Sequence, residues 1–267
     1  MKQIKTNQNQ NNKYMKQVVR LNIAALSLLL FFFSSVLVQA QSSVAFQSGS
    51  YIVNMGLHAN VLSTDISREL KPYGLIYDLL KNYNVPVQVV INPNKVKDGA
   101  DFVYNGVSYR GGTFIIEKQY ISPSVAARIS YWNSVGVVGA YMSSSLVLTT
   151  AYKISSVPTW TLDAQNGAIA TGFFTNAGIP VTAYNYLAPS QLGLCSDIFV
   201  MPHADPTWAT HGNLLNWNQQ YKGAIWLGCH AGSALENMYN PSNTAQQTNF
   251  LSTKATTAGT GITLPAN

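Results

Sequence analysis

Cysteine and charge are both scarce in this 267-residue chain. It holds only two cysteines, which excludes a scaffold stapled by several disulfides. Charged residues make up only 10% of the chain, whereas 47% of the residues are hydrophobic and 11% are aromatic. That is too much core-forming material for a disordered chain, so we expect a folded globular protein.

The formal net charge of +6 is confined to the amino terminus. Five of the 16 Lys and Arg residues lie within residues 1–20, which contain no acid, and from residue 41 onward 11 cations face 10 acids. A near-neutral body without a basic cluster has no surface suited to phosphate backbones, so we expect no nucleic-acid partner.

The cationic start is followed by an apolar run over residues 21–38 and by Val38-Gln39-Ala40, whose small residues are spaced as at a signal-peptidase site. This pattern predicts a signal peptide over residues 1–40, a mature protein that begins at Gln41, and a secreted or cell-surface location. The membrane is then a partner only during export. The alternative is a transmembrane anchor, because about eighteen apolar residues can just span a bilayer.

The mature chain alternates short apolar runs with helical patterns. Residues 51–55, 70–83 and 85–91 read as strand, helix and strand, which predicts a βαβ unit with parallel strands. Asn105-Gly106 predicts a hairpin within residues 98–116, and Pro123 predicts the first position of a helix.

The second half of the chain repeats this alternation. Strands are expected over residues 180–184, 198–201 and 224–227, and helices over residues 164–176, 214–220 and 231–238. We therefore predict an α/β domain over residues 41–240, built on a doubly wound, mostly parallel, flavodoxin-like sheet with a β-hairpin excursion. The continuously apolar run 224–227 is expected to be a central strand covered on both faces. Residues 241–267 are expected to be a low-complexity linker, or the truncated start of a following region.

The densest group of reactive side chains follows the last two predicted strands. His203 and Asp205 come after strand 198–201, with His211 a little further on, and Cys229 and His230 come after strand 224–227. Because the carboxyl ends of parallel strands meet at one edge of a sheet, we expect these residues to share that edge.

Cys229 is the candidate nucleophile. It lies between a predicted strand and a helix, with glycines one residue before it and three after it, as in a nucleophile elbow, and a helix start stabilises a thiolate. The alternative is a buried structural cysteine. Cys195 precedes the neighbouring strand and therefore lies at the other end of the sheet, so both thiols are expected to be free.

Two segments, Ser196 to His203 and Lys222 to Leu235, resemble the core of the class I glutamine amidotransferase-like superfamily, and the Cys-His pair is most similar to its PfpI-type branch. The resemblance implies that Cys229 is the nucleophile, that His230 is its base, and that the backbone amides after Met201 and Cys229 form an oxyanion hole. The mature segment also resembles an uncharacterised domain near the amino terminus of long secreted bacterial surface proteins. The chain departs from the superfamily at His203-Ala204, where the superfamily has Gly-Gly. It has no histidine beyond His230, so glutamine amidotransfer is not expected.

Three functions therefore remain open. The first is a secreted cysteine hydrolase of amide or ester bonds, or a related caspase-like peptidase, that needs no cofactor and acts on a peptide, a glycan or a small amide or ester. Cys229 would attack, His230 or His203 would act as base, and Asp205 or Glu236 would orient it. The second is a metal-dependent hydrolase that uses His203, Asp205 and His211. The third is a non-catalytic binding or display module of a longer surface protein.

Overall fold

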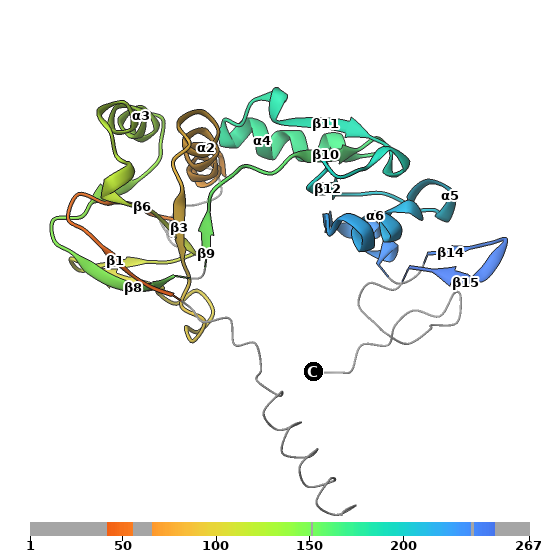
Figure 1. Ribbon diagram of the computed structural model, residues 1–267, viewed down its shortest axis with the longest axis horizontal. Coiled ribbons are helices and arrows are strands. Elements are labelled where there is room, and N and C mark those ends of the chain that lie inside the picture. Colours follow the sequence, from red (N-terminus) through yellow and green to blue (C-terminus); the bar gives the residue numbers. More distant parts are fainter. Residues whose placement is uncertain (1–41, 56–65, 151, 236–237, 249–267) are drawn as a thin grey trace, which may run out of the picture. The chain divides into compact units, whose positions relative to one another are not determined.

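The computed structural model (Figure 1) describes residues 42–55, 66–150, 152–235 and 238–248, all within one compact unit, Ser42–Asn267. The predicted signal peptide and Glu236 lie outside the described residues, as do residues 249–267 of the expected linker. Among the described residues there is no helix with the length and apolarity needed to cross a membrane. The alternative of an anchor over residues 21–38 lies outside them.

The strands form two main sheets. The antiparallel sheet has the order β7-β2-β6-β3-β9, and the parallel sheet has the order β11-β10-β12-β13. The antiparallel sheet consists of β2 (Tyr51–Val53), β3 (Val87–Val90), β6 (Thr113–Ile116), β7 (Gly139–Tyr141) and β9 (Tyr152–Ile154). The parallel sheet consists of β10 (Trp160–Asp163), β11 (Tyr184–Leu187), β12 (Ile198–Met201) and β13 (Ala224–Leu227). A general α/β class is confirmed, but the strands do not form one mostly parallel sheet.

Three antiparallel pairs complete the strands. They are β1 (Ser42–Phe46) with β8 (Leu146–Thr150), β4 (Phe102–Tyr104) with β5 (Val107–Tyr109), and β14 (Tyr239–Asn240) with β15 (Asn243–Gln247). The β4–β5 pair is the hairpin predicted from Asn105-Gly106, and both residues have the positive φ that such a turn requires. Strand β15 lies in the expected linker, so regular structure extends past residue 240.

The predicted βαβ unit has the right elements but the wrong pairing. Strands β2 and β3 flank helix α2 (Ile66–Tyr83) in the chain, yet β6 lies between them and pairs antiparallel with both. A later segment has thus been inserted between the two strands, which the local pattern does not reveal. Strands β8 and β9 were not predicted either, although β8 carries the apolar run Leu146-Val147-Leu148.

Helix α3 (Pro123–Ser134) begins where predicted. The Ser122 hydroxyl accepts a hydrogen bond from the Val125 N–H, and Pro123 occupies the first turn, where a proline costs no hydrogen bond. Helix α2 packs against both α3 and α4 (Thr171–Ala177), and Figure 1 shows it between them. Asp78 of α2 is buried and accepts hydrogen bonds from the Trp132 indole N–H (2.7 Å) and the Asn82 amide (2.7 Å), and it pairs with Arg128.

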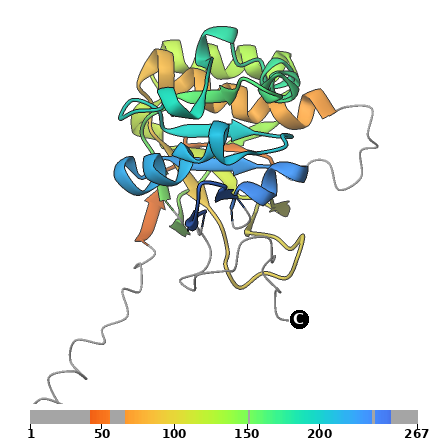
Figure 2. The same ribbon diagram turned by 90° about the vertical axis from the view of Figure 1, so that its right-hand side faces the viewer.

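Helices cover the two faces of the parallel sheet unequally. On one face, helices α5 (Trp208–His211) and α6 (Asn213–Tyr221) lie over Phe199 and Met201. The turn η4 (Gly167–Ala170) and the short α4 lie on the other face, and Figures 1 and 2 show the strands between these two groups of helices. Strand β11 begins at Tyr184, later than predicted, because Val181–Ala183 form a 3₁₀ turn.

The prediction of a central strand over residues 224–227 is wrong. Strand β13 pairs only with β12 and is an edge strand of the parallel sheet in the described part of the chain. Ile225 and Leu227 pack against the α6 side, whereas Trp226, on the opposite face, is 48% exposed. A continuous apolar run does not tell whether a second helix covers the strand. The helix expected over residues 231–238 is instead a 3₁₀ helix, η7 (Cys229–Ala234).

Candidate functional site

The candidate site lies at the carboxyl edge of the parallel sheet, beside the last two strands. Met201 of β12 pairs with Leu227 of β13, so His203 and Cys229 each follow at the same distance from neighbouring strand ends. In parallel α/β sheets this is the edge at which ligands bind. The sequence prediction that these two residues share an edge is therefore confirmed.

Cys229 has an unusual backbone conformation. Its φ angle is +49°, in the left-handed region that residues other than glycine enter at a cost of about 1–3 kcal/mol and that recurs at functional sites. The turn is also tight at Gly228, where an added Cβ would lie 2.7 Å from the Pro202 carbonyl oxygen. The Cys229 side chain is exposed, so it is not the buried structural cysteine of the alternative reading. Cys195 is also exposed, and both thiols are free, as predicted.

Two histidines lie beside this thiol. One ligand-type atom each of His203, Cys229 and His230 lies within 4.8 Å of the others. The imidazole rings of His203 and His230 have their centroids 5.1 Å apart and are tilted by 38°. Both the neighbouring histidine, His230, and the histidine after the next strand, His203, therefore lie within 4.8 Å of the thiol, so either could become its base after a small side-chain movement.

Asp205 extends this group. Its Oδ1 lies 3.4 Å from Nδ1 of His230, so thiol, imidazole and carboxylate occur in the order of a catalytic triad. Both side chains are well exposed, at 69% for His230 and 82% for Asp205, so the pair contributes at most about 1 kcal/mol to stability. Because Asp205 contacts Nδ1 of His230, the other ring nitrogen, Nε2, is left without this partner. Glu236, the other predicted orienting carboxylate, lies outside the described residues.

Two backbone donors are also available. Pro202 has no N–H, so the nearest donor after Met201 is the amide of His203. Within the described residues, the N–H groups of His203 and His230 donate no hydrogen bond to the protein. The start of η7 leaves the His230 donor free, and the amide after the nucleophile is the one that an elbow directs at an oxyanion.

His211, which sequence analysis placed in the alternative metal set, is instead buried. Its Nδ1 accepts a hydrogen bond from the Thr207 N–H (3.3 Å), and its Nε2 lies 3.6 Å from Oδ1 of the buried Asp163. Among the described residues, the group of close ligand atoms comprises His203, Cys229 and His230, without Asp205 or His211. Sequence analysis missed Asp163, although it ends β10 at the same sheet edge and could have been found from that position.

A cleft of about 330 Å³ is lined by residues that follow Asp205 and His230 closely in the chain. Pro206 and Ser233 contribute to its walls, and the Ser233 hydroxyl donates a hydrogen bond of 2.9 Å to the His230 carbonyl oxygen. The remaining walls include the rings of Trp208 and Tyr239 and carry no charged side chain. The cleft therefore suits an uncharged, ring-bearing or apolar group.

Comparisons with known proteins identify no relative. No protein-family model, no curated protein and no solved structure matches the chain.

Proposed function

We propose that this chain is a cysteine-dependent hydrolase of amide or ester bonds. The observation that carries the proposal is the exposed, left-handed Cys229 at a strand end, with His203 and His230 beside its thiol. A strained backbone at an exposed cysteine that has two imidazoles nearby is typical of a nucleophile held in place for attack.

The reaction follows from these groups. Imidazole takes the Cys229 proton, and the thiolate adds to the substrate carbonyl carbon, where the N–H groups of His203 and His230 can bind the oxyanion. The carbon–nitrogen or carbon–oxygen bond then breaks, the leaving amine or alcohol takes the proton from imidazolium, and an acyl thioester remains on Cys229. Water, deprotonated by the same imidazole, hydrolyses the thioester to a carboxylic acid and restores the thiol.

We assign His230 as the base, because Asp205 contacts its Nδ1 and can stabilise the imidazolium, leaving Nε2 to exchange the proton. His203 then helps to hold the substrate carbonyl. The substrate is a peptide, a glycan-linked amide or a small amide or ester whose uncharged part lies in the cleft formed by Pro206, Trp208 and Tyr239.

The same proposal includes membership of the class I glutamine amidotransferase-like superfamily. The order β11-β10-β12-β13, with His203 and Cys229 after adjacent parallel strands, supports it. We further propose that the protein is exported and acts outside the cell, on the basis of the signal-like residues 1–40.

The two cysteines supply a matched test, because both are exposed and free. The chain is incubated with p-nitrophenyl acetate, and acetylated peptides are quantified by mass spectrometry over time. We expect a burst of p-nitrophenol with acetyl on Cys229, no burst for Cys229→Ala and a normal burst for Cys195→Ala. His230→Ala should slow both acetylation and thioester hydrolysis by at least about a hundredfold, as expected for loss of a general base. Acetylation of Cys229 no faster than that of Cys195 would exclude the proposal.

One observation favours a second candidate, a metal site. A thiolate and two imidazoles whose ligand atoms lie within 4.8 Å of one another form an N₂S set that suits zinc and leaves a fourth position for water. If this candidate is right, protein purified without a histidine tag should hold one zinc per chain and lose it in His203→Ala, and chelators should stop ester hydrolysis. Metal well below one equivalent would remove this candidate. If the acylation test also fails, the remaining hypothesis is a non-catalytic binding or display module.

A further inference from the structure

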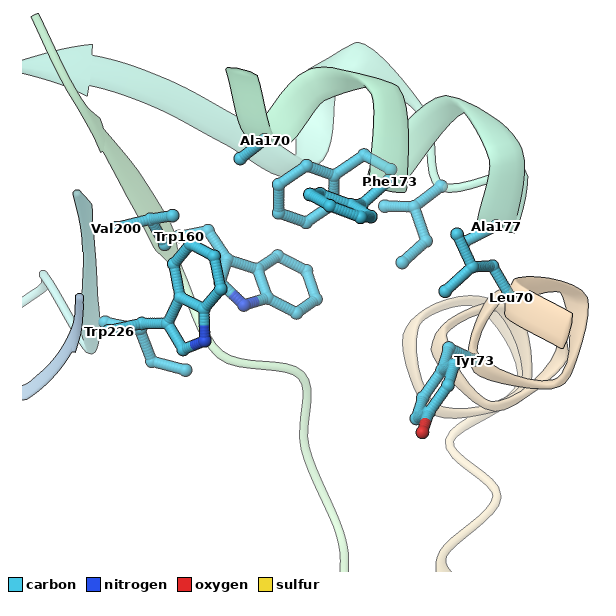
Figure 3. Close-up of a pocket in the computed structure, with 11 residues that line it drawn as sticks. Leu70, Tyr73, Trp160, Ala170, Phe173, Ala177, Val200 and Trp226 are labelled. Carbon is cyan, nitrogen blue, oxygen red and sulfur yellow. The ribbon is translucent and has the colours of Figure 1, made fainter. Parts of the chain in front are cut away.

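A second cavity lies on the other face of the parallel sheet, away from α5 and α6. Its volume is about 400 Å³, within the range of small-molecule sites. Its walls come from helices α2 and α4, from the central strands β10 and β12 and from the edge strand β13, with Ala170 of η4 and Ile179 after α4. Figure 3 shows the rings of Tyr73, Trp160, Phe173 and Trp226 arranged around it. We call it the aromatic cavity.

Several large aromatic side chains of the aromatic cavity are partly exposed to solvent. Tyr73 is 46% exposed, Phe173 53% and Trp226 48%, although these three side chains belong to three different elements and line one concavity. Single exposed apolar residues are ordinary on protein surfaces, but several that converge on a hollow mark a binding site. The Trp160 ring is held by an edge-on contact with Phe174, with centroids 5.2 Å apart, so this wall is formed in advance.

The lining also restricts the chemistry of a ligand. It contains no charged side chain, and its only polar side-chain atoms are the indole N–H groups of Trp160 and Trp226 and the hydroxyl of Tyr73. None of these three groups makes a hydrogen bond to the described part of the protein. An indole nitrogen can only donate, so the cavity offers donors and almost no acceptors. A sugar, whose hydroxyls need acceptors, and an ion of either sign are poorly matched to it.

We propose that the aromatic cavity binds a small, uncharged ligand with a flat ring system that carries hydrogen-bond acceptor oxygens, such as an aromatic ketone, ester or ether. Its rings pack between Trp226, Trp160 and Phe173, and its oxygens accept hydrogen bonds from the indole N–H groups. This site is separate from the proposed hydrolase site. The two sites share no lining residue, and the cavity lies on the face of β12 that carries Ile198 and Val200, whereas Cys229 follows the carboxyl end of β13.

The test uses Prodan, a neutral naphthyl ketone whose emission moves to the blue in apolar surroundings. It is titrated into the purified full chain, and sedimentation is measured in parallel. We expect a saturable blue shift at one probe per chain. Trp226→Ala and Phe173→Ala should each weaken binding by about tenfold, because each removes one aromatic wall. Trp226→Phe, which keeps a ring but removes the N–H donor, should weaken it by a few-fold.

The matched control is Tyr131→Ala, which removes an aromatic ring of similar exposure (49%) from α3, outside the cavity. It should bind the probe as the unaltered chain does. The proposal is overturned if the shift does not saturate, if Trp226→Ala and Tyr131→Ala have equal effects, or if an anionic naphthyl probe binds as tightly as the neutral one. A dimer that Trp226→Ala dissociates would also overturn it, because a second copy of the chain would then be the occupant.

Discussion

The contact between helices α2 and α4 can be tested at Gly74. This residue lies inside α2, where replacing glycine with alanine normally stabilises a helix by about 1 kcal/mol. In this fold, however, an added Cβ would lie 1.8 Å from the Ala177 carbonyl oxygen and 2.6 Å from the Trp132 ring, well inside ordinary contact. Helix propensity and packing therefore predict opposite signs for Gly74→Ala.

Packing should dominate, because the clash is with backbone and cannot be relieved by a side-chain rotation. The two helices must separate by more than 1 Å, which loosens the small cluster of Tyr77, Ala177 and Ile179 between them. Overpacking typically costs about 1–3 kcal/mol, and a backbone clash belongs at the upper end of that range. After the gain in helix propensity, we expect Gly74→Ala to destabilise the fold by about 2 kcal/mol, or about 4–8 °C in Tm.

Gly172 supplies the control. It lies in α4, and an added Cβ would meet nothing within 4 Å, so Gly172→Ala should be neutral or stabilise the fold by up to about 1 kcal/mol. Urea unfolding followed by circular dichroism measures both variants. If Gly74→Ala is as stable as Gly172→Ala, then α2 and α4 do not pack as described and the reasoning is refuted.

Three further predictions concern stability and processing. Burial raises the pKa of Tyr51 to about 12. The contribution of the neutral Tyr51 side chain to the free energy of unfolding is therefore fully present below about pH 10 and is lost between about pH 10 and pH 12. This loss amounts to roughly 2–3 kcal/mol. Urea unfolding should show a loss smaller by about that amount in Tyr51→Phe, in which other tyrosines with raised pKa values, such as Tyr109 and Tyr141, still titrate. Asp78→Ala should lower the unfolding free energy by about 3–5 kcal/mol, because it leaves the Arg128 guanidinium and the Trp132 indole N–H without their partner. Lys97→Ala, which breaks the exposed ion pair with Asp98, should leave the unfolding free energy nearly unchanged, and equal effects of the two variants would contradict the assignment. Intact mass of the exported protein should place Gln41 at the amino terminus, whereas retention of residues 21–38 would refute the signal peptide.

The sequence alone determined features that depend on neighbours along the chain. The Ser122–Pro123 start of α3, the Asn105-Gly106 hairpin and the strands β12 and β13 follow from caps, turn residues and short apolar runs. The approach of His203 to Cys229 was also predictable, because two consecutive parallel strands bring their carboxyl ends to one edge.

Only the tertiary structure decided which strands pair and what covers them. The insertion of β6 between β2 and β3, and the edge position of β13, depend on segments distant in the chain, whose contacts leave no local pattern. The burial of His211 against Asp163 and the half-exposed Trp226 follow from that arrangement. An apolar run records that a strand can be buried, but the layer that buries it, or leaves a cavity in its place, is set by packing across the whole fold.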